Sequence, residues 1–79
     1  MKKVLGIYDN HNKLYVQREL HNLSLLGYNT ELHNNETFSL RYNTPCFICT
    51  KNGSIVSKLF GKYSSDKVSV WVRNKLKVI

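Results

Sequence analysis

The sequence predicts an α/β fold, a four-stranded mixed sheet with helices packed on it, in the element order βαβ(α)ββα. Three observations predict it. A short apolar run precedes an amphipathic helical pattern, an Asn-Gly pair separates two strand-like segments, and a serine-capped helical pattern follows. A chain of 79 residues has room for one compact domain, so we expect a single domain over residues 1–79.

The N-terminal part is typical of a strand–helix–strand unit. Residues 3–8 are mostly apolar and are followed by Asn10 and Asn12, which are both candidate helix caps. In the next segment the apolar residues fall at helical spacing: Val16, Leu20 and Leu23, with Leu26 beside them. We therefore expect a helix over residues 13–26, stopped by Gly27. A helix of this length between two strands indicates a right-handed βαβ crossover.

The second strand is expected over residues 28–33. Because side chains alternate along a strand, two pairs should face opposite ways: Thr30 with Leu32, and Glu31 with His33. After a polar turn, residues 38–42 are expected to form one helical turn.

The C-terminal part predicts a hairpin followed by a helix. Residues 46–50 and 54–60 have strand composition and flank Asn52-Gly53, the strongest short hairpin signal. Gly61 then interrupts the second strand. Ser64 or Ser65 is expected to cap a last helix. One face of that helix carries its apolar residues: Val68, Trp71, Val72 and Leu76.

Charge is unevenly distributed along the chain. The formal net charge is +7, and from residue 51 onward seven basic residues face a single acid, Asp66. We take six of them as a candidate basic surface: Lys51, Lys58, Lys62, Lys67, Arg73 and Lys75. Such a surface would attract an acidic protein or nucleic acid, although lysines also simply keep a small domain soluble. The sequence predicts no membrane span and no signal peptide, so we expect a cytoplasmic protein.

Residues 44–53, Thr-Pro-Cys-Phe-Ile-Cys-Thr-Lys-Asn-Gly, resemble the thioredoxin segment that runs from its cis-proline through a strand to a Lys-Asn-Gly hairpin. Gly61, Ser64, Val68 and Trp71 resemble its continuation. Residues 3–9, with Lys13 and a helix after them, resemble the opening of small phage-type glutaredoxins, and the likeness is weakest over residues 33–42. The resemblance implies a minimal thioredoxin-like fold with a cis bond between Thr44 and Pro45.

The departure from the family concerns its chemistry. Thioredoxins and glutaredoxins carry Cys-x-x-Cys at the start of the first helix, where the helix N-terminus lowers the pKa of the first thiol. Here the matching stretch, residues 14–17, is Leu-Tyr-Val-Gln. Thiol–disulfide exchange needs an attacking and a resolving sulfur, so by the family's mechanism this chain is redox-inactive.

Cys46 and Cys49 are the only cysteines, and they form a Cys-x-x-Cys in a strand. On a strand, positions three apart point to opposite faces, with Cα atoms about 10 Å apart, whereas a disulfide tolerates roughly 7 Å. We expect two buried structural cysteines. The alternatives are a single reactive thiol at Cys46, or a working dithiol or metal pair.

By the family resemblance, a binding groove is expected beside the cis-proline. In the family the backbone of the residue before this proline pairs with an extended peptide or with glutathione, which implies that role for Thr44. Tyr15, near the place of the lost motif, is a candidate contact beside Thr44 and Pro45. No cofactor is expected, with glutathione as the alternative, and no metal site is predicted because His11, His21 and His33 are scattered and expected at the surface.

Three functions follow, in order of preference. The first is a redox-inactive protein-binding module, an accessory or host-takeover protein of a phage acting in the host cytoplasm, whose partner has an acidic surface. The second is a thiol–disulfide oxidoreductase that uses Cys46, alone or with Cys49. The third is nucleic-acid binding through the basic C-terminal half.

Overall fold

The computed structural model describes residues 2–37 and 43–77. Its elements follow in the predicted order: β1 (Lys2–Tyr8), α1 (Lys13–Leu25), β2 (Asn29–Asn34), β3 (Cys46–Lys51), β4 (Ser54–Phe60) and α2 (Ser65–Lys75). The expected helical turn at residues 38–42 lies outside the described residues. Neither helix of the described part is long and apolar enough to span a membrane.

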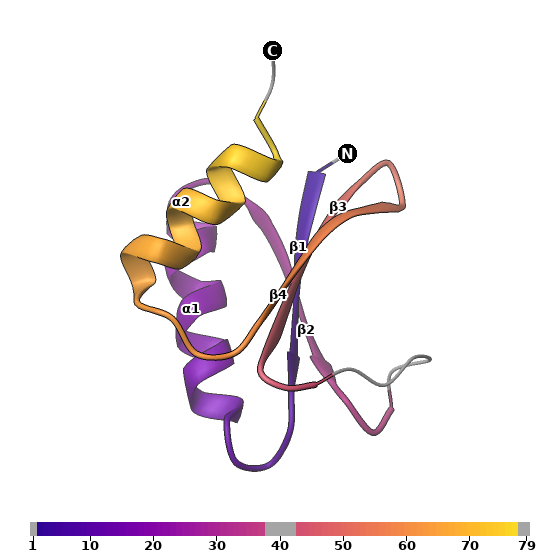
Figure 1. Ribbon diagram of the computed structural model, residues 1–79, viewed down its shortest axis with the longest axis vertical. Helices are drawn as coiled ribbons and strands as arrows, with labels where there is room; N and C mark the ends of the chain where they lie inside the picture. The colour runs from indigo at the N-terminus through magenta and orange to yellow at the C-terminus, as the bar shows by residue number, and fades with distance from the viewer. Residues whose placement is uncertain (1, 38–42, 78–79) are drawn as a thin grey trace.

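The four strands form one mixed sheet in the order β2-β1-β3-β4 (Figure 1). β1 runs parallel to β2 and antiparallel to β3, and β3 pairs antiparallel with β4. The parallel pair joined through α1 is the predicted βαβ unit, and the antiparallel pair is the predicted hairpin. The predicted fold class is confirmed, and the arrangement matches a small α/β thioredoxin-like fold.

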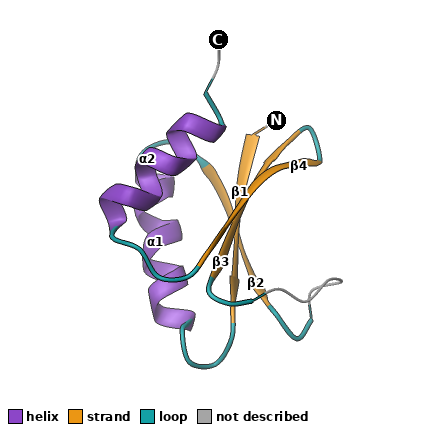
Figure 2. Cartoon of the chain, in the orientation of Figure 1, coloured by secondary structure: helices purple, strands orange, loops and turns teal. Residues whose placement is uncertain are grey.

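Both described helices lie on the same side of the sheet (Figure 2). The larger core forms between them and the strands: Val4, Val16, Leu20, Leu23, Phe47, Cys49, Val68, Val72 and Leu76. α1 approaches β1 so closely that a Cβ at Gly6 would stand 2.6 Å from side-chain carbons of both Val16 and Leu20. The smaller core consists of strand residues on the opposite face: Ile7, Cys46 and Ile48, with Leu5 packed against them.

Several local predictions are confirmed. Gly27 has φ +98° just after α1, and the hairpin turn places Asn52 at φ 54° and Gly53 at φ 82°. These are left-handed conformations that favour glycine and asparagine. The Ser64 hydroxyl accepts a hydrogen bond of 3.2 Å from the Lys67 amide and so caps α2. The bond between Thr44 and Pro45 is cis, as the resemblance implied.

Two details of α1 differ from expectation. Asn12 occupies the N-cap position, but its side chain makes no capping bond, because its Oδ1 accepts instead from the Asp9 amide at 2.9 Å. The predicted helix includes Leu26, beside the apolar stripe, whereas Leu26 lies after the end of α1 and is 64% exposed. In a continued helix, Leu26 would lie three residues after Leu23 and face the core. Because α1 ends at Leu25, Leu26 does not reach that position.

A buried carboxylate that the sequence analysis missed ties α2 to α1. Glu19 is buried within α1, and its Oε2 accepts a hydrogen bond of 2.8 Å from the Ser65 hydroxyl at the start of α2. The Arg18 Nε lies 3.8 Å from the same oxygen. This pairing fixes the beginning of α2 over the middle of α1, and with it the loop before α2.

Candidate functional site

Three loops meet at the end of the sheet next to the start of α1. The first connects β1 to α1, the second contains Pro45, and the third connects β4 to α2. The Gly61 amide donates to the Pro45 carbonyl at 2.8 Å, which joins the second and third loops. The structure therefore brings together the three residues of the expected groove, Tyr15, Thr44 and Pro45, around one end of the sheet.

Tyr15 is built into this end as a structural link. Its hydroxyl donates to the Tyr63 carbonyl and accepts from the Tyr63 amide, both at 2.8 Å. Its ring packs edge-on against Phe47, with centroids 6.1 Å apart, and burial raises the pKa of the Tyr15 hydroxyl. The hydroxyl thus satisfies both polar backbone groups of Tyr63. Tyr15 closes the space between α1 and the third loop.

Thr44 and Pro45 are also engaged in internal contacts. Pro45 is buried, and the half-buried Thr44 donates its hydroxyl to the Asp9 carboxylate. That bond, together with the one from the His11 amide, holds the pKa of Asp9 below its usual range. The Thr44 side chain therefore links the second loop to the first, and the Asp9 carboxylate beside it stays ionised.

The residue most available to a partner here is Leu14, in the first turn of α1. Its side chain is 80% exposed, the highest value among the large apolar residues of the described chain. Two ammonium groups flank this end of the helix: Lys13 lies over the Tyr8 ring at 5.5 Å and Lys62 over the Tyr15 ring at 5.7 Å. An exposed apolar side chain thus lies beside two cations at the start of α1.

The two cysteines are fully buried, free, and on opposite faces of the sheet. Cys46 belongs to the smaller core, and Cys49 belongs to the larger core on the helix side of the sheet. Burial raises the pKa of Cys46 to about 11 and that of Cys49 to about 12. The charges that act on them also lie apart: Lys58 opposes the shift at Cys46, and Lys75 opposes it at Cys49. Each thiol is therefore neutral at physiological pH and separated from the other by the sheet.

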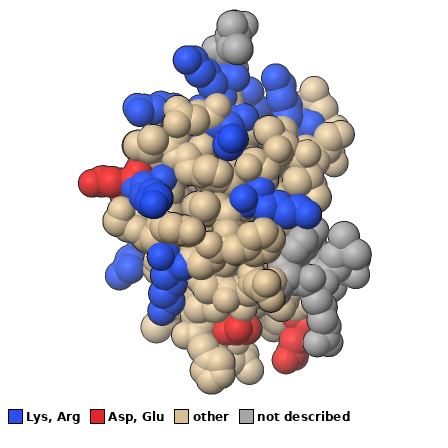
Figure 3. Space-filling model, in the orientation of Figure 1, with Lys and Arg blue, Asp and Glu red and all other residues tan. Residues whose placement is uncertain are grey.

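The predicted basic residues do not form one continuous surface. Lys51 lies at the hairpin end of β3, whereas Lys58 pairs in register with Ile48 and so faces away from the helices. Lys62 belongs to the loop before α2, and the other three lie on α2 itself: Lys67, Arg73 and Lys75. On the face shown in Figure 3, the basic side chains spread over the upper part and down the left side, and the acidic ones lie at the left edge and near the bottom.

The histidines do not come together. His11 and His21 are exposed, whereas His33 is half-buried with its Nε2 3.0 Å from Glu31 Oε1. Glu31 also binds Lys3, and both contacts lower the pKa of its carboxyl. His33 is therefore more engaged than the surface position expected for it. Across residues 2–37 and 43–77, no group of three metal-ligating side chains is present.

No protein-family model matches this chain, and no curated protein matches it significantly. The assignment of a role to this end of the sheet therefore depends on its own geometry. The sequence carried a signal for Leu14, because it lies outside the stripe of Val16, Leu20 and Leu23. It carried none for the pairing of Tyr15 with Tyr63, which are 48 residues apart.

Proposed function

We propose that the protein is a redox-inactive thioredoxin-like module that binds another protein at the end of the sheet around Leu14. The observation that carries this proposal is that a leucine is exposed at the start of α1 while both cysteines are buried. The exposed first turn of α1 holds Leu14, whereas both thiols of the chain are buried on opposite faces of the sheet. A nucleophilic thiol must be accessible and partly ionised, and neither cysteine is.

The chemistry around Leu14 favours a partner with an apolar pocket and an acidic rim. Burying the exposed Leu14 side chain against a partner is favourable, since complete burial of a leucine side chain contributes about 1.5–3 kcal/mol. Lys13 and Lys62 flank it, and the whole chain carries a net charge of +7. Such a charge attracts an acidic surface and accelerates association. A phage accessory protein that acts on a host protein is one setting for this activity.

The absence of redox activity is tested by thioredoxin-type insulin reduction and by glutathione-dependent disulfide reduction. We expect the wild-type protein and a Cys46→Ser variant to give the same background rate in both assays. Turnover by the wild type that disappears in Cys46→Ser would contradict the proposal and establish the oxidoreductase alternative.

Binding is tested by affinity capture from the cells in which the protein is made, followed by titration with the purified partner. We expect wild type to bind one defined protein, and Leu14→Glu to weaken that complex at least tenfold, an effect of about 1.4 kcal/mol. Ile55→Glu is the matched control, because Ile55 is an exposed apolar residue on β4, away from this end of α1. Equal binding by both variants would contradict a contact at Leu14.

Nucleic-acid binding is tested separately, by titration with an oligonucleotide. If the basic residues bind nucleic acid, the affinity for a single-stranded oligonucleotide should fall steeply between about 50 and 200 mM salt. Tight, salt-sensitive binding of the oligonucleotide that is unaffected by Leu14→Glu would contradict the proposed function.

A further inference from the structure

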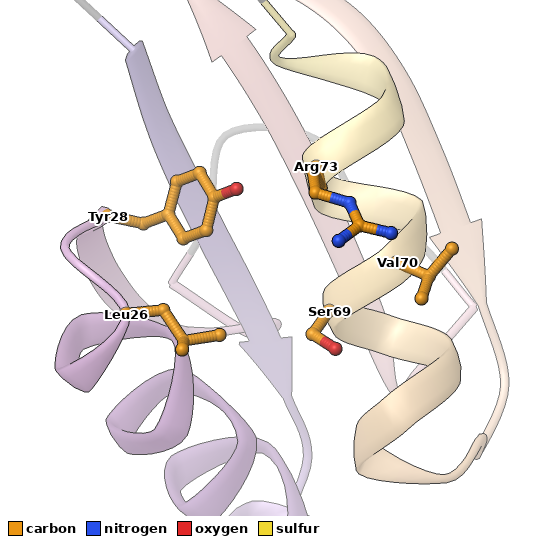
Figure 4. Close-up of a pocket in the computed structure, with 5 residues that line it drawn as sticks. All are labelled: Leu26, Tyr28, Ser69, Val70 and Arg73. Atoms are coloured by element: carbon orange, nitrogen blue, oxygen red, sulfur yellow. The ribbon is translucent and has the colours of Figure 1, made fainter.

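A groove runs between the end of α1 and the outer side of α2. Its cavity has a volume of about 350 Å³ and is lined by Leu26, Tyr28, Ser69, Val70 and Arg73. Leu26 and Tyr28 extend from the end of α1 toward α2, and the Arg73 side chain lies along the facing part of α2, above Ser69 (Figure 4). The groove thus has an apolar wall on one side and a cationic group on the other.

The apolar side chains of this groove stand in solvent. Leu26 is 64% exposed and Val70 is 43% exposed. Val70 also borders a second hollow of about 530 Å³ that reaches the start of α2 and includes the half-buried indole of Trp71 and the side chain of Lys67. Val70 therefore lies between two hollows. Each combines apolar surface with one basic residue, and the second also includes the acid Asp66.

The charge of this surface is one-sided. Along α2, three basic residues, Lys67, Arg73 and Lys75, stand against the single acid Asp66. Residues 20–28, which supply the α1 side of the groove, contain no lysine, arginine, aspartate or glutamate. The apolar patch is therefore bordered by cations, with its one acidic residue confined to the start of α2.

We propose that this groove binds an acidic segment of a partner protein that carries a large apolar side chain. The apolar side chain enters between Leu26 and Val70, and a neighbouring carboxylate pairs with the Arg73 guanidinium, whose planar fork suits a carboxylate. This surface is distinct from the end of the sheet around Leu14. The inference rests on the proposed function only in taking the ligand to be a protein.

Charge and apolarity together select this occupant over two others. A nucleic acid backbone would use the cations but would leave the exposed leucine and valine without a partner. A second copy of the chain would bring together two molecules of net charge +7, each with its basic α2 at the contact. An acidic, apolar segment satisfies both components of the surface.

The test is selection from a displayed library of random short peptides on the immobilised full-length protein. We expect enrichment of peptides that combine aspartate or glutamate with leucine, phenylalanine or tryptophan. When such a peptide is added to the isotope-labelled protein, the amide NMR signals of Ser69, Val70 and Arg73 should shift.

Two matched pairs of variants give the test its specificity. Arg73→Gln should weaken peptide binding about tenfold, whereas Lys75→Gln, also a cation of the last turn of α2 but outside the groove, should change it less than twofold. Val70→Glu should abolish binding, and Val56→Glu should not, although Val56 on β4 is similarly exposed at 45%.

Three outcomes would overturn the inference. They are enrichment of no peptide class, binding that Arg73→Gln leaves unchanged, and shifts confined to Leu14 and Thr44. The third would place the ligand at the end of the sheet, overturning the groove while leaving the proposed function intact. Conversely, disulfide reductase activity would overturn the proposed function, but the peptide-induced shifts of the α2 amide signals would still support the groove.

Discussion

The two faces of the sheet bury their apolar residues in different ways. On one face, both described helices cover Val4, Phe47 and Cys49 and form the larger core with them. On the other, Ile7, Cys46 and Ile48 form a core of strand residues, and no helix of residues 2–37 or 43–77 lies over it (Figure 1). Each face holds one fully buried cysteine.

This difference explains why a Cys-x-x-Cys sequence yields no redox centre. On a helix the two sulfurs would lie near one another, whereas on β3 the alternation of side chains sends them to separate cores. Each thiol then contributes to packing as a small apolar group. The secondary structure around the motif, more than the motif itself, decides its chemistry.

The largest predicted effect contrasts two phenylalanines. Phe47 points into the helix-side core and is fully buried, whereas Phe60 pairs with Cys46 on the opposite face and is 43% exposed. Phe47→Ala should lower the free energy of unfolding by about 3–5 kcal/mol, and Phe60→Ala by about 1 kcal/mol. Urea denaturation measures both. Equal losses would show that the helix-side core is not the dominant one.

The close approach of α1 to β1 gives the next effect. A Cβ at Gly6 would overlap Val16 and Leu20, so Gly6→Ala should destabilise the protein by about 2–3 kcal/mol through overpacking. Thermal unfolding measures it. The control is Gly53→Ala at the hairpin, where nothing lies within 4 Å and only the positive φ is strained. A neutral Gly6→Ala would contradict the packing of α1 on β1.

The buried thiols predict a loss of stability in alkali. Their pKa values of about 11 and 12 in the folded protein lie above the value of about 8.5 for an unfolded thiol, so the unfolded state releases protons first. Their contribution is complete below about pH 8.5 and decreases as pH rises toward 11 and 12. We expect a loss of about 3 kcal/mol from the two thiols together by pH 9.5.

The control for the alkaline effect is the double variant Cys46→Ala/Cys49→Ala. Compared with wild type, its free energy of unfolding should fall less between pH 8.5 and 10. Parallel pH profiles for the two proteins would show that lysines and tyrosines cause the whole loss, and that the thiols are not desolvated in the folded state.

The smallest predicted effect concerns the link at the end of the sheet. Tyr15→Phe removes the hydroxyl that binds both backbone groups of Tyr63 and should cost about 1 kcal/mol in the free energy of unfolding. Hydrogen exchange at the Tyr63 amide should accelerate in this variant. Tyr28→Phe, on the groove between the helices, serves as control. Unchanged exchange at Tyr63 would contradict the closure of this end by Tyr15.

The fold was predictable because its signals are local. Helical spacing in α1, the Asn52-Gly53 turn and the Ser64 cap each act within a few residues. The site was predictable only in part. The opposite placement of Cys46 and Cys49 follows from strand alternation. Two other features join distant segments: the bond between Tyr15 and Tyr63, and the burial of Glu19 beside Ser65. No local sequence pattern predicts either of them.

The separation of the two thiols by the sheet is tested most directly by a redox titration. Native protein is equilibrated in glutathione buffers from fully reducing to fully oxidising, and its mass is measured after acid quenching. We expect two free thiols and no glutathione adduct across the whole series. An intramolecular disulfide that forms with a defined midpoint potential would contradict it.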